Sequence, residues 1–206
     1  KYVASTGKPM ILSTGMADEK EIQEAIDVAR EGGCKEIAIL HCVSGYPAPA
    51  EDYNLRVIPD MIQRFGLVTG LSDHTLDNTT AIVSIAMGAS MVEKHFTLDR
   101  NGGGPDDSFS LEPEQLKQLC EQSRVAWESL GSVNYERKKS EQENAKFRRS
   151  LYVVKDIKAG EIITKENVKS IRPGFGLDPK FYEQVMGRTV SCDISFGTPL
   201  SLEDLR

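Results

Sequence analysis

Two of the chain's three histidines follow short apolar runs that are typical of strands. His74 comes after Val68–Leu71, and His95 comes after Met91–Val92. The apolar, small-residue segment Thr79–Met87 between them has the length of a helix, so the two strands should be parallel. Because the carboxyl ends of parallel strands lie at one edge of a sheet, we expect both imidazoles to meet there. Such a pair predicts a divalent-metal site, and two hydrogen-bonded structural histidines are the alternative.

Further polar side chains lie at the ends of the predicted strands. Ser13, Ser44 and Ser72 supply hydroxyl groups, and Tyr46 adds a ring and a hydroxyl at the same edge. Hydroxyls and backbone N–H groups near helix N-termini suit a phosphate or a carboxylate. Ordinary capping of strand ends explains the serines equally well.

Two loops carry charged candidates for binding or catalysis. Asp106 and Asp107 lie in a glycine-rich acidic loop, where they can bind sugar hydroxyls, act as acid or base, or simply form a turn. Arg172 lies between Ile171 and Pro173-Gly174, which restrict the backbone. Its guanidinium either faces an anion or an acetamido oxygen, or is a solvated charge.

The elements that position these residues repeat a strand-then-helix pattern. Pro9–Ser13 and Ile37–Cys42 read as two further strands, and Ala17–Glu31 reads as a helix. Pro113 opens a last helix that runs to Leu130, with four candidate apolar contacts, Leu116, Leu119, Val125 and Trp127. Four β-then-α units are half of a (β/α)8 TIM barrel, and a four-stranded open sheet is the alternative.

The pattern changes after the last of these units. We predict that residues 1–131 form the α/β part, that 132–149 form a charged linker or a solvated helix, and that 150–206 form a small β-rich domain. Five short strands are expected there, Leu151–Val154, Ile162-Ile163, Val168–Ile171, Val190–Ile194 and Thr198–Leu200. The chain begins without Met and almost directly in a strand, which favours the C-terminal part of a longer protein.

Composition narrows the class of protein. The 206 residues carry a net charge of -6, which disfavours nucleic acid and anionic membranes as partners. The four cysteines have no metal-binding spacing, and we interpret them as reduced core residues. Without a signal peptide or an apolar span of about 20 residues, a cytoplasmic protein is expected.

Five motifs follow one another along the chain: KPMILSTGM, HCVSGYP, GLSDHT, EKHFTLDRNGGGPDDSFSLEP and IRPGFG. Together they resemble the sialic acid synthase family, which condenses phosphoenolpyruvate with an acetamido sugar to give a nine-carbon keto acid and phosphate. The region from Ser150 onward resembles the family's antifreeze-like (SAF) domain, a β-clip fold. DDSFSLEP and IRPGFGLDPKF are most similar to the pseudaminic acid synthases, and N-acetylneuraminate and legionaminate synthases are the alternatives.

The resemblance implies roles for individual residues. His74 and His95 would hold a divalent ion, Mn2+ or Mg2+, while Ser13 and Ser72 would bind phosphoenolpyruvate. Ser44 would be a further contact, at a position where the family often has Asn. Tyr46 and Asp106 would face the sugar, with Asp106 also catalytic. Arg172 would reach the site of a partner subunit, because the homodimers of this family are domain-swapped through the SAF domain.

The resemblance also implies a missing part. The family's first four strands carry a lysine and a glutamate that face phosphoenolpyruvate, and this sequence has no equivalent of them. We therefore expect an enzyme whose present stretch is inactive by itself. A non-catalytic sugar-binding or dimerisation module is a second hypothesis, and a metal-dependent epimerase or aldolase is a third.

Overall fold

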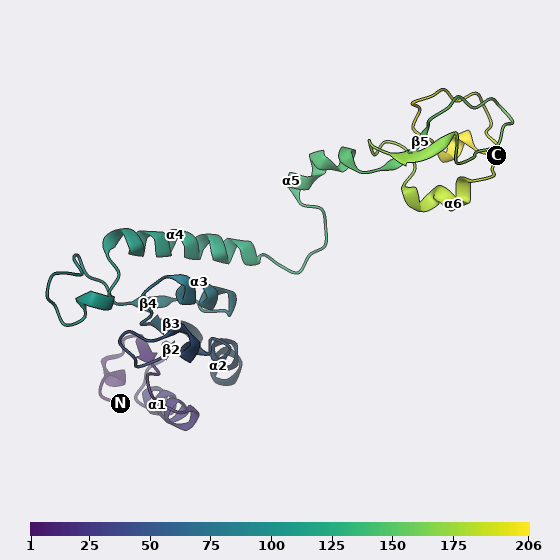
Figure 1. The fold of residues 1–206 in the computed structure, drawn as a ribbon. Helices are drawn as coiled ribbons and strands as arrows, with labels where there is room; N and C mark the ends of the chain where they lie inside the picture. The colour runs from purple at the N-terminus through teal and green to yellow at the C-terminus, as the bar shows by residue number, and fades with distance from the viewer. The chain divides into compact units, whose positions relative to one another are not determined.

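The computed structural model describes residues 1–206, which divide into two compact units, Lys1–Ser132 and Val133–Arg206 (Figure 1). The first unit alternates strands and helices. Its elements are η1 (Ala4–Thr6), β1 (Met10–Ser13), α1 (Glu19–Glu31), β2 (Ile37–Cys42), η2 (Ala50–Tyr53), α2 (Val57–Phe65), β3 (Val68–Asp73), α3 (Thr79–Ala86), β4 (Val92–Lys94), η3 (Asp107–Phe109) and α4 (Pro113–Leu130). The predicted β-then-α units are thus confirmed.

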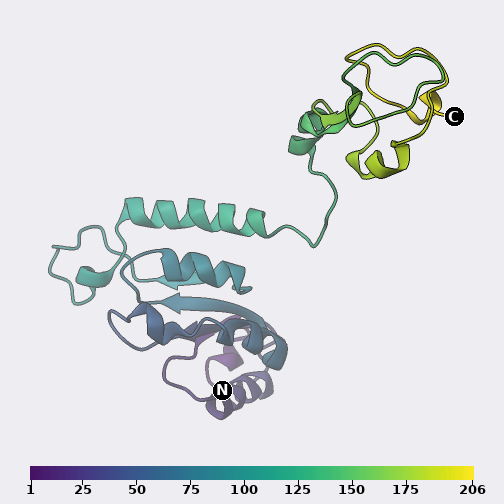
Figure 2. The ribbon, with the colours of Figure 1, turned by 45° about the vertical axis from the view of Figure 1, so that its right-hand side comes forward.

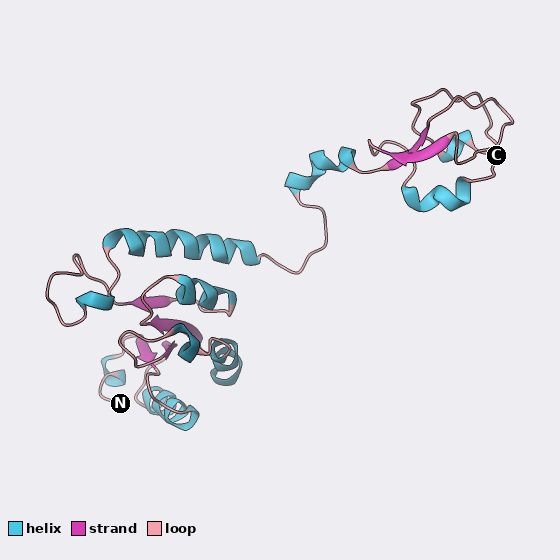
Figure 3. Ribbon diagram, in the orientation of Figure 1, coloured by secondary structure: helices cyan, strands magenta, loops and turns pink.

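All four strands of the first unit pair in parallel, in the order β1-β2-β3-β4. The sheet curls, with α1 to α4 around its outer side (Figure 2 and Figure 3). A sequential, all-parallel order puts every strand's carboxyl end at the same edge. The result is a half-barrel in which the loops after β1, β2, β3 and β4 share one rim.

Strand side chains alternate between the two faces of this sheet. Met10 and Leu12 of β1 pack with the core that α1 and α2 cover, whereas Ile11 between them is 59% exposed. The register aligns Ile11, Ala38 and Val68 across three strands, and Val68 is 52% exposed. The inner face of the half-barrel therefore presents a row of apolar side chains.

Helix boundaries follow from capping groups. In α1, Asp18 accepts hydrogen bonds from the N–H groups of Lys20 and Glu21, and the Glu21 carboxylate accepts from Asp18 N–H. Helix α4 runs from Pro113 to Leu130, which confirms its predicted bounds.

The predicted apolar contacts of α4 are largely wrong. Of the four side chains, only Leu119 is buried, while Leu116, Val125 and Trp127 are 36%, 61% and 66% exposed. The helix packs beside α3 through a narrow stripe, so apolar residues outside that stripe stay at the surface.

The second unit has its own apolar core of nine residues, Leu151, Val153, Ile157, Ile163, Val168, Val185, Val190, Ile194 and Leu200. Its elements are α5 (Lys139–Gln142), η4 (Glu143–Phe147), β5 (Ser150–Val153), β6 (Val168–Ile171), η5 (Pro179–Phe181), α6 (Tyr182–Val185) and η6 (Leu202–Asp204). Strands β5 and β6 are antiparallel. Three of the five predicted strands are wrong, because Ile162, Val190, Ile194 and Pro199 make only isolated bridges.

The segment 132–149, predicted to be a linker or a solvated helix, contains α5 and η4. The Lys146 carbonyl accepts a hydrogen bond from Gly174 N–H at 2.9 Å. This end of the segment therefore packs onto the β-rich part of the second unit.

The cysteine prediction holds for two residues and is wrong for two. All four thiols are free; Cys34 and Cys42 are buried, whereas Cys120 and Cys192 are exposed. Cys120 lies on the partly uncovered helix α4, and Cys192 lies in a turn outside the second core. No helix has both the length and the apolar character needed to cross a bilayer.

We predict that residues 1–206 expressed alone self-associate. Strands β1 and β4 each have an open edge, and Ile11 and Val68 leave an apolar inner face exposed. Light scattering should report oligomers, and an Ile11→Lys/Val68→Lys variant should shift the population toward the monomer. Ile162→Lys, at a residue of similar exposure in the second unit, is the matched control and should shift nothing. A monodisperse monomer of the unmodified chain would contradict the prediction.

Candidate active site

His74 and His95 lie directly after β3 and β4, at the shared rim of the half-barrel. Their ring centroids are 5.2 Å apart, in an edge-to-face arrangement. Tyr46, from the loop after β2, places its ring 4.3 Å from His74 and 5.8 Å from His95. Three consecutive strand ends thus bring a phenol and two imidazoles together.

His74 is fixed at its backbone and at its ring. Its Nδ1 lies 2.7 Å from the Val43 carbonyl, which selects the tautomer in which Nδ1–H donates and Nε2 keeps its lone pair. Its N–H donates to the Tyr53 hydroxyl, and its carbonyl accepts from Ala48 N–H at 3.1 Å. The ring is therefore held in one orientation with Nε2 available.

Tyr53 is the buried support beneath this histidine. Its ring is fully buried, and its hydroxyl donates to the Ser72 carbonyl at 3.3 Å while accepting from His74 N–H. Burial, the largest cause, raises the pKa of Tyr53 well above its ordinary value. The phenol therefore stays protonated and can serve as donor and acceptor at once.

His95 lies beside Phe109, with ring centroids 5.0 Å apart, and its Nδ1 is 3.5 Å from Asp106 Oδ2. Its carbonyl accepts a hydrogen bond from Leu111 N–H at 2.8 Å. The carboxylate beside Nδ1 favours the tautomer that leaves Nε2 free. The sequence analysis missed Phe109, although an aromatic residue inside a polar loop next to a histidine strand was a usable signal.

The two adjacent aspartates have different surroundings. Asp107 accepts a hydrogen bond from Gly104 N–H at 2.7 Å. A hydrogen bond with Thr97, the largest cause, and the one from Gly104 hold the pKa of Asp107 below its usual value. A Cβ on Gly104 would lie 2.9 Å from the Asp107 carboxylate, so the loop needs glycine there. Asp107 therefore folds the loop, while Asp106 faces His95.

The donor set fits a divalent metal ion. Two imidazoles with free Nε2 atoms are suitable ligands, with Nδ1 of His74 bound to a carbonyl and Nδ1 of His95 facing a carboxylate. No group of three or more His, Cys, Asp and Glu side chains is close enough to hold an ion by itself. The remaining positions would fall to water or substrate, as in catalytic sites that keep open positions.

The three predicted serines lie at or near the carboxyl ends of three neighbouring strands, but their surroundings differ. Ser13 is exposed at the end of β1, and the Ser44 hydroxyl lies beside Gly15, where an added Cβ would be 3.2 Å from its Oγ. Ser72 is buried, and its hydroxyl donates to Glu93 at 2.9 Å. Glu93, which the sequence analysis missed, thus adds a carboxylate on the same face of the sheet as Ser72.

A buried ion pair lies on the opposite face of the sheet. Lys94 Nζ is 2.9 Å from Asp73 Oδ2, and their side chains are 3% and 0% exposed. The sequence analysis missed this pair too. The signal for this pair was available in the sequence: an acidic residue directly precedes His74 and a basic residue directly precedes His95. Oppositely charged residues at matching positions of neighbouring strands can pair across the sheet.

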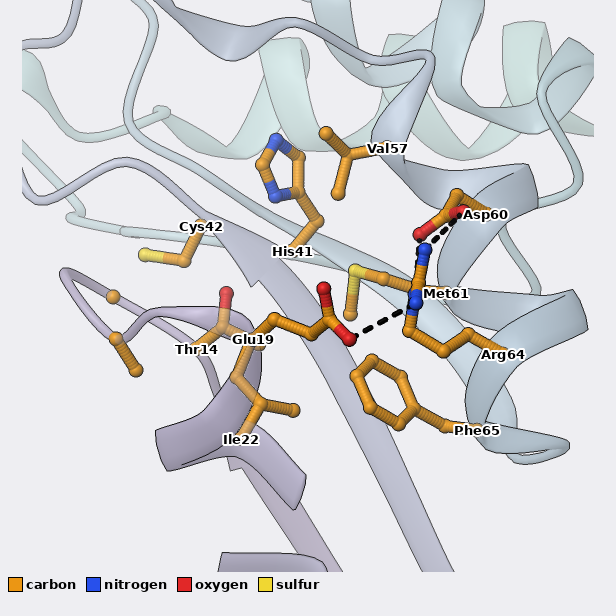
Figure 4. Close-up of a pocket in the computed structure, with 12 residues that line it drawn as sticks. Thr14, Glu19, Ile22, His41, Cys42, Val57, Asp60, Met61, Arg64 and Phe65 are labelled. Carbon is orange, nitrogen blue, oxygen red and sulfur yellow. Dashed lines mark hydrogen bonds and ion pairs between the residues drawn. The ribbon is translucent and has the colours of Figure 1, made fainter. Parts of the chain in front are cut away.

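The third histidine lies outside this constellation. His41 Nε2 contacts the Tyr53 carbonyl, and its ring borders a separate cavity of about 250 Å3 between α1 and α2. In that cavity Arg64 pairs with both Glu19 and Asp60, so its charge is already neutralised (Figure 4). The cavity offers no free charge for an anionic substrate.

Arg172 belongs to the second unit, and its side chain is exposed. The loop that carries it is well fixed, because the Ser150 hydroxyl donates to Pro173 O at 2.7 Å and accepts from Gly176 N–H at 2.9 Å. A Cβ on Gly176 would clash with the Leu151 carbonyl. The loop therefore presents Arg172 to solvent from a rigid base.

Comparisons with known proteins agree with the resemblance seen in the motifs. The model of the NeuB family matches residues 1–135, and that of the SAF domain matches residues 148–206. The crystal structure of spore coat polysaccharide biosynthesis protein SpsE from Bacillus subtilis superposes with a TM-score of 0.60 at 35% identity, covering 100% of this chain and 63% of that one.

Two enzymes from Campylobacter jejuni illustrate the range of relatives. A pseudaminic acid synthase (strain 81-176) is 39% identical over 206 residues, which are 100% of this chain and 60% of the relative. An N,N'-diacetyllegionaminic acid synthase (strain NCTC 11168) is 42% identical over 191 residues, 91% of this chain and 57% of the relative. The chain thus spans about 60% of the length of the curated relatives it matches. With its first unit matched by the family model and its second by the SAF model, the chain belongs to the NeuB family of synthases.

Proposed function

We propose that the protein condenses phosphoenolpyruvate with an acetamido sugar to form a nonulosonic acid, with pseudaminic acid as the product class. Water is consumed and inorganic phosphate is released. The observation that carries the proposal is the cluster of His74, His95, Tyr46 and Asp106 at one rim, in a chain 39% identical to a pseudaminic acid synthase. In the whole protein this half-barrel would be completed to a (β/α)8 barrel.

The two free imidazole nitrogens would hold Mn2+ or Mg2+, which would polarise the aldehyde of the open-chain sugar. The protein's own groups would supply orientation and proton transfer. Asp106, 3.5 Å from His95 and with its side chain 56% exposed, can accept a hydrogen bond from a sugar hydroxyl or move a proton there. The exposed ring of Tyr46 offers a flat apolar surface to the sugar.

Phosphoenolpyruvate would lie toward the earlier strands. Ser13 ends β1 and Ser44 follows β2 at the same rim, and the glycine-containing turn after β1 lies beside the Ser44 hydroxyl. Ser72 already donates its proton to Glu93, so its hydroxyl would accept from a water molecule that in turn donates to phosphoenolpyruvate. Hydroxyls around an anionic substrate suit the binding of its phosphate and carboxylate groups.

Arg172 would act from the SAF domain of a partner subunit in a domain-swapped homodimer. Its hydrogen-bonded loop supports this role, because a backbone that is already ordered loses little conformational entropy on binding. The acetamido oxygen of the sugar is its expected acceptor.

A legionaminate synthase is the second candidate, favoured by the 42% identity to the Campylobacter jejuni enzyme of that name. The experiment that separates the candidates offers the full-length protein a panel of acetamido sugars with phosphoenolpyruvate. We expect phosphate release to be fastest with the pseudaminate precursor. If none of the acetamido sugars in the panel supports phosphate release, the proposed function is refuted.

We predict that His74→Asn and His95→Ala each lower the condensation rate by about 1000-fold or more, since losing a Lewis-acid contribution of several kcal/mol has that effect. Asparagine at 74 keeps a donor for the Val43 carbonyl and removes only the free Nε2. Circular dichroism should report an unchanged fold. Full activity of both variants would contradict the prediction.

The two aspartates give a matched pair of variants. We expect Asp106→Asn to lower kcat by about 100-fold or more, because a positioned acid or base contributes that much. Asp107→Asn removes a carboxylate that only orders the loop, so it should chiefly raise the KM for the sugar. Steady-state kinetics with both substrates measure this split. Equal kcat losses would show that Asp106 has no special role.

Arg172→Ala should raise the KM for the sugar by about 10- to 100-fold, since a hydrogen bond to a charged group is worth about 1.5–3 kcal/mol. The KM for phosphoenolpyruvate should change far less. Mixing Arg172→Ala subunits with His74→Asn subunits tests the swap. In a swapped heterodimer one site collects both defects and the other neither, so part of the activity returns. No recovery, with subunit exchange confirmed separately, would count against the swap.

A further inference from the structure

Asp73 and Lys94 are the residues immediately before the two rim histidines. They face each other in the register of β3 and β4, and their side chains form the ion pair at 2.9 Å. Strand β4 has only three residues and pairs with β3 alone. A strand this short has few backbone hydrogen bonds to fix its position, so side-chain contacts at its end matter.

The ion pair also fixes the turn that follows β3. Lys94 Nζ donates to the carbonyls of Thr75 and Asp77, each at 2.8 Å, as well as to Asp73. Its three protons therefore have three acceptors, all in residues 73–77. Asp73 Oδ1 in turn accepts from Thr75 N–H at 2.8 Å.

Apart from the Tyr46 ring, which lies beside both imidazoles, the other supports of the two histidines do not connect them. His74 is held by Val43, Tyr53 and Ala48, whereas His95 is held through Leu111. The Ser72–Glu93 hydrogen bond crosses between the strands on the other face, one residue earlier than the ion pair. The ion pair is thus the cross-strand side-chain link nearest to both rings.

We propose that Asp73 and Lys94 are positioning residues that set the separation of His74 and His95 for a shared divalent ion. The inference rests on the metal site of the proposed function. Both charges are buried where their hydrogen bonds restrict them to one geometry, so the strand ends cannot slide without separating the pair. An apolar pair would fill the same space but would tolerate such a shift.

The test removes both charges together, because a single replacement leaves one charge buried without a partner. Asp73→Asn/Lys94→Met keeps the volume of both side chains and the acceptor for Thr75 N–H. Asp73→Asn/Lys94→Gln is the second variant, and its amide can still donate to a backbone carbonyl of the turn. Asp60→Asn, which removes one partner of the exposed Arg64 pair on α2, is the matched control.

Binding of Mn2+ to the full chain is measured from the free-ion signal in electron paramagnetic resonance, without any turnover. Co2+ absorption in the visible range then reports ligand geometry. We expect both double variants to bind Mn2+ about 10- to 100-fold more weakly, as when groups that orient metal ligands are lost, and to shift the Co2+ spectrum. Asp60→Asn should match the unmodified protein, and His95→Ala should bind weakest.

Two further results separate this inference from the function on which it rests. If the double variants fold with the unmodified Mn2+ affinity and Co2+ spectrum while His95→Ala loses binding, the metal site stands and the positioning role is overturned. If Mn2+ binds the unmodified protein and His95→Ala equally, or binds neither, the metal site and this inference both fail.

Discussion

The buried ion pair between Asp73 and Lys94 joins the carboxyl ends of β3 and β4 at the rim of the half-barrel. Removing two charges from water is costly, and the cost is offset only when every proton and lone pair finds a partner. Here Lys94 uses its three donors on the turn after β3, and Asp73 binds both Lys94 and Thr75. The strand ends, the turn and the residues that follow them are therefore one connected arrangement rather than separate loops.

The parallel sheet divides structural and chemical tasks between its two faces. On the outer face, Leu71 and Val92 pack beneath the helices and the ion pair lies next to them. On the inner face, Ser72 and Glu93 pair one step below the histidine rings. Side chains alternate between the two faces along β3 and β4. Neighbouring residues can therefore anchor the sheet on one face and present polar groups on the other.

The loop after β4 shows how one short acidic segment serves two purposes. The Asp107 carboxylate accepts a hydrogen bond from the backbone of its own glycine-rich turn. Its neighbour Asp106 faces His95 instead. The second unit follows the same principle with neutral groups. There the Ser150 hydroxyl joins Pro173 to Gly176, so the loop bearing Arg172 is held while the guanidinium stays exposed. In both places a hydrogen-bonded backbone presents one exposed charged side chain.

The sequence by itself determined the local and the familial features of this protein. Hydrophobic periodicity with flanking Pro, Gly and acidic residues placed the parallel units and the bounds of α4, and ordered motifs identified the family. The sequence predicted too many strands in the second unit. Several of those segments form only isolated β-bridges, which no local sequence pattern encodes.

Only the tertiary structure decided which residues meet. Asp73 and Lys94 are 21 residues apart, and Phe109 reaches His95 through a loop. The exposure of Trp127 and Cys120 likewise depends on what covers α4. Periodicity reports only which face a residue occupies, whereas contacts across strands depend on register and loop path, which the whole packed chain sets.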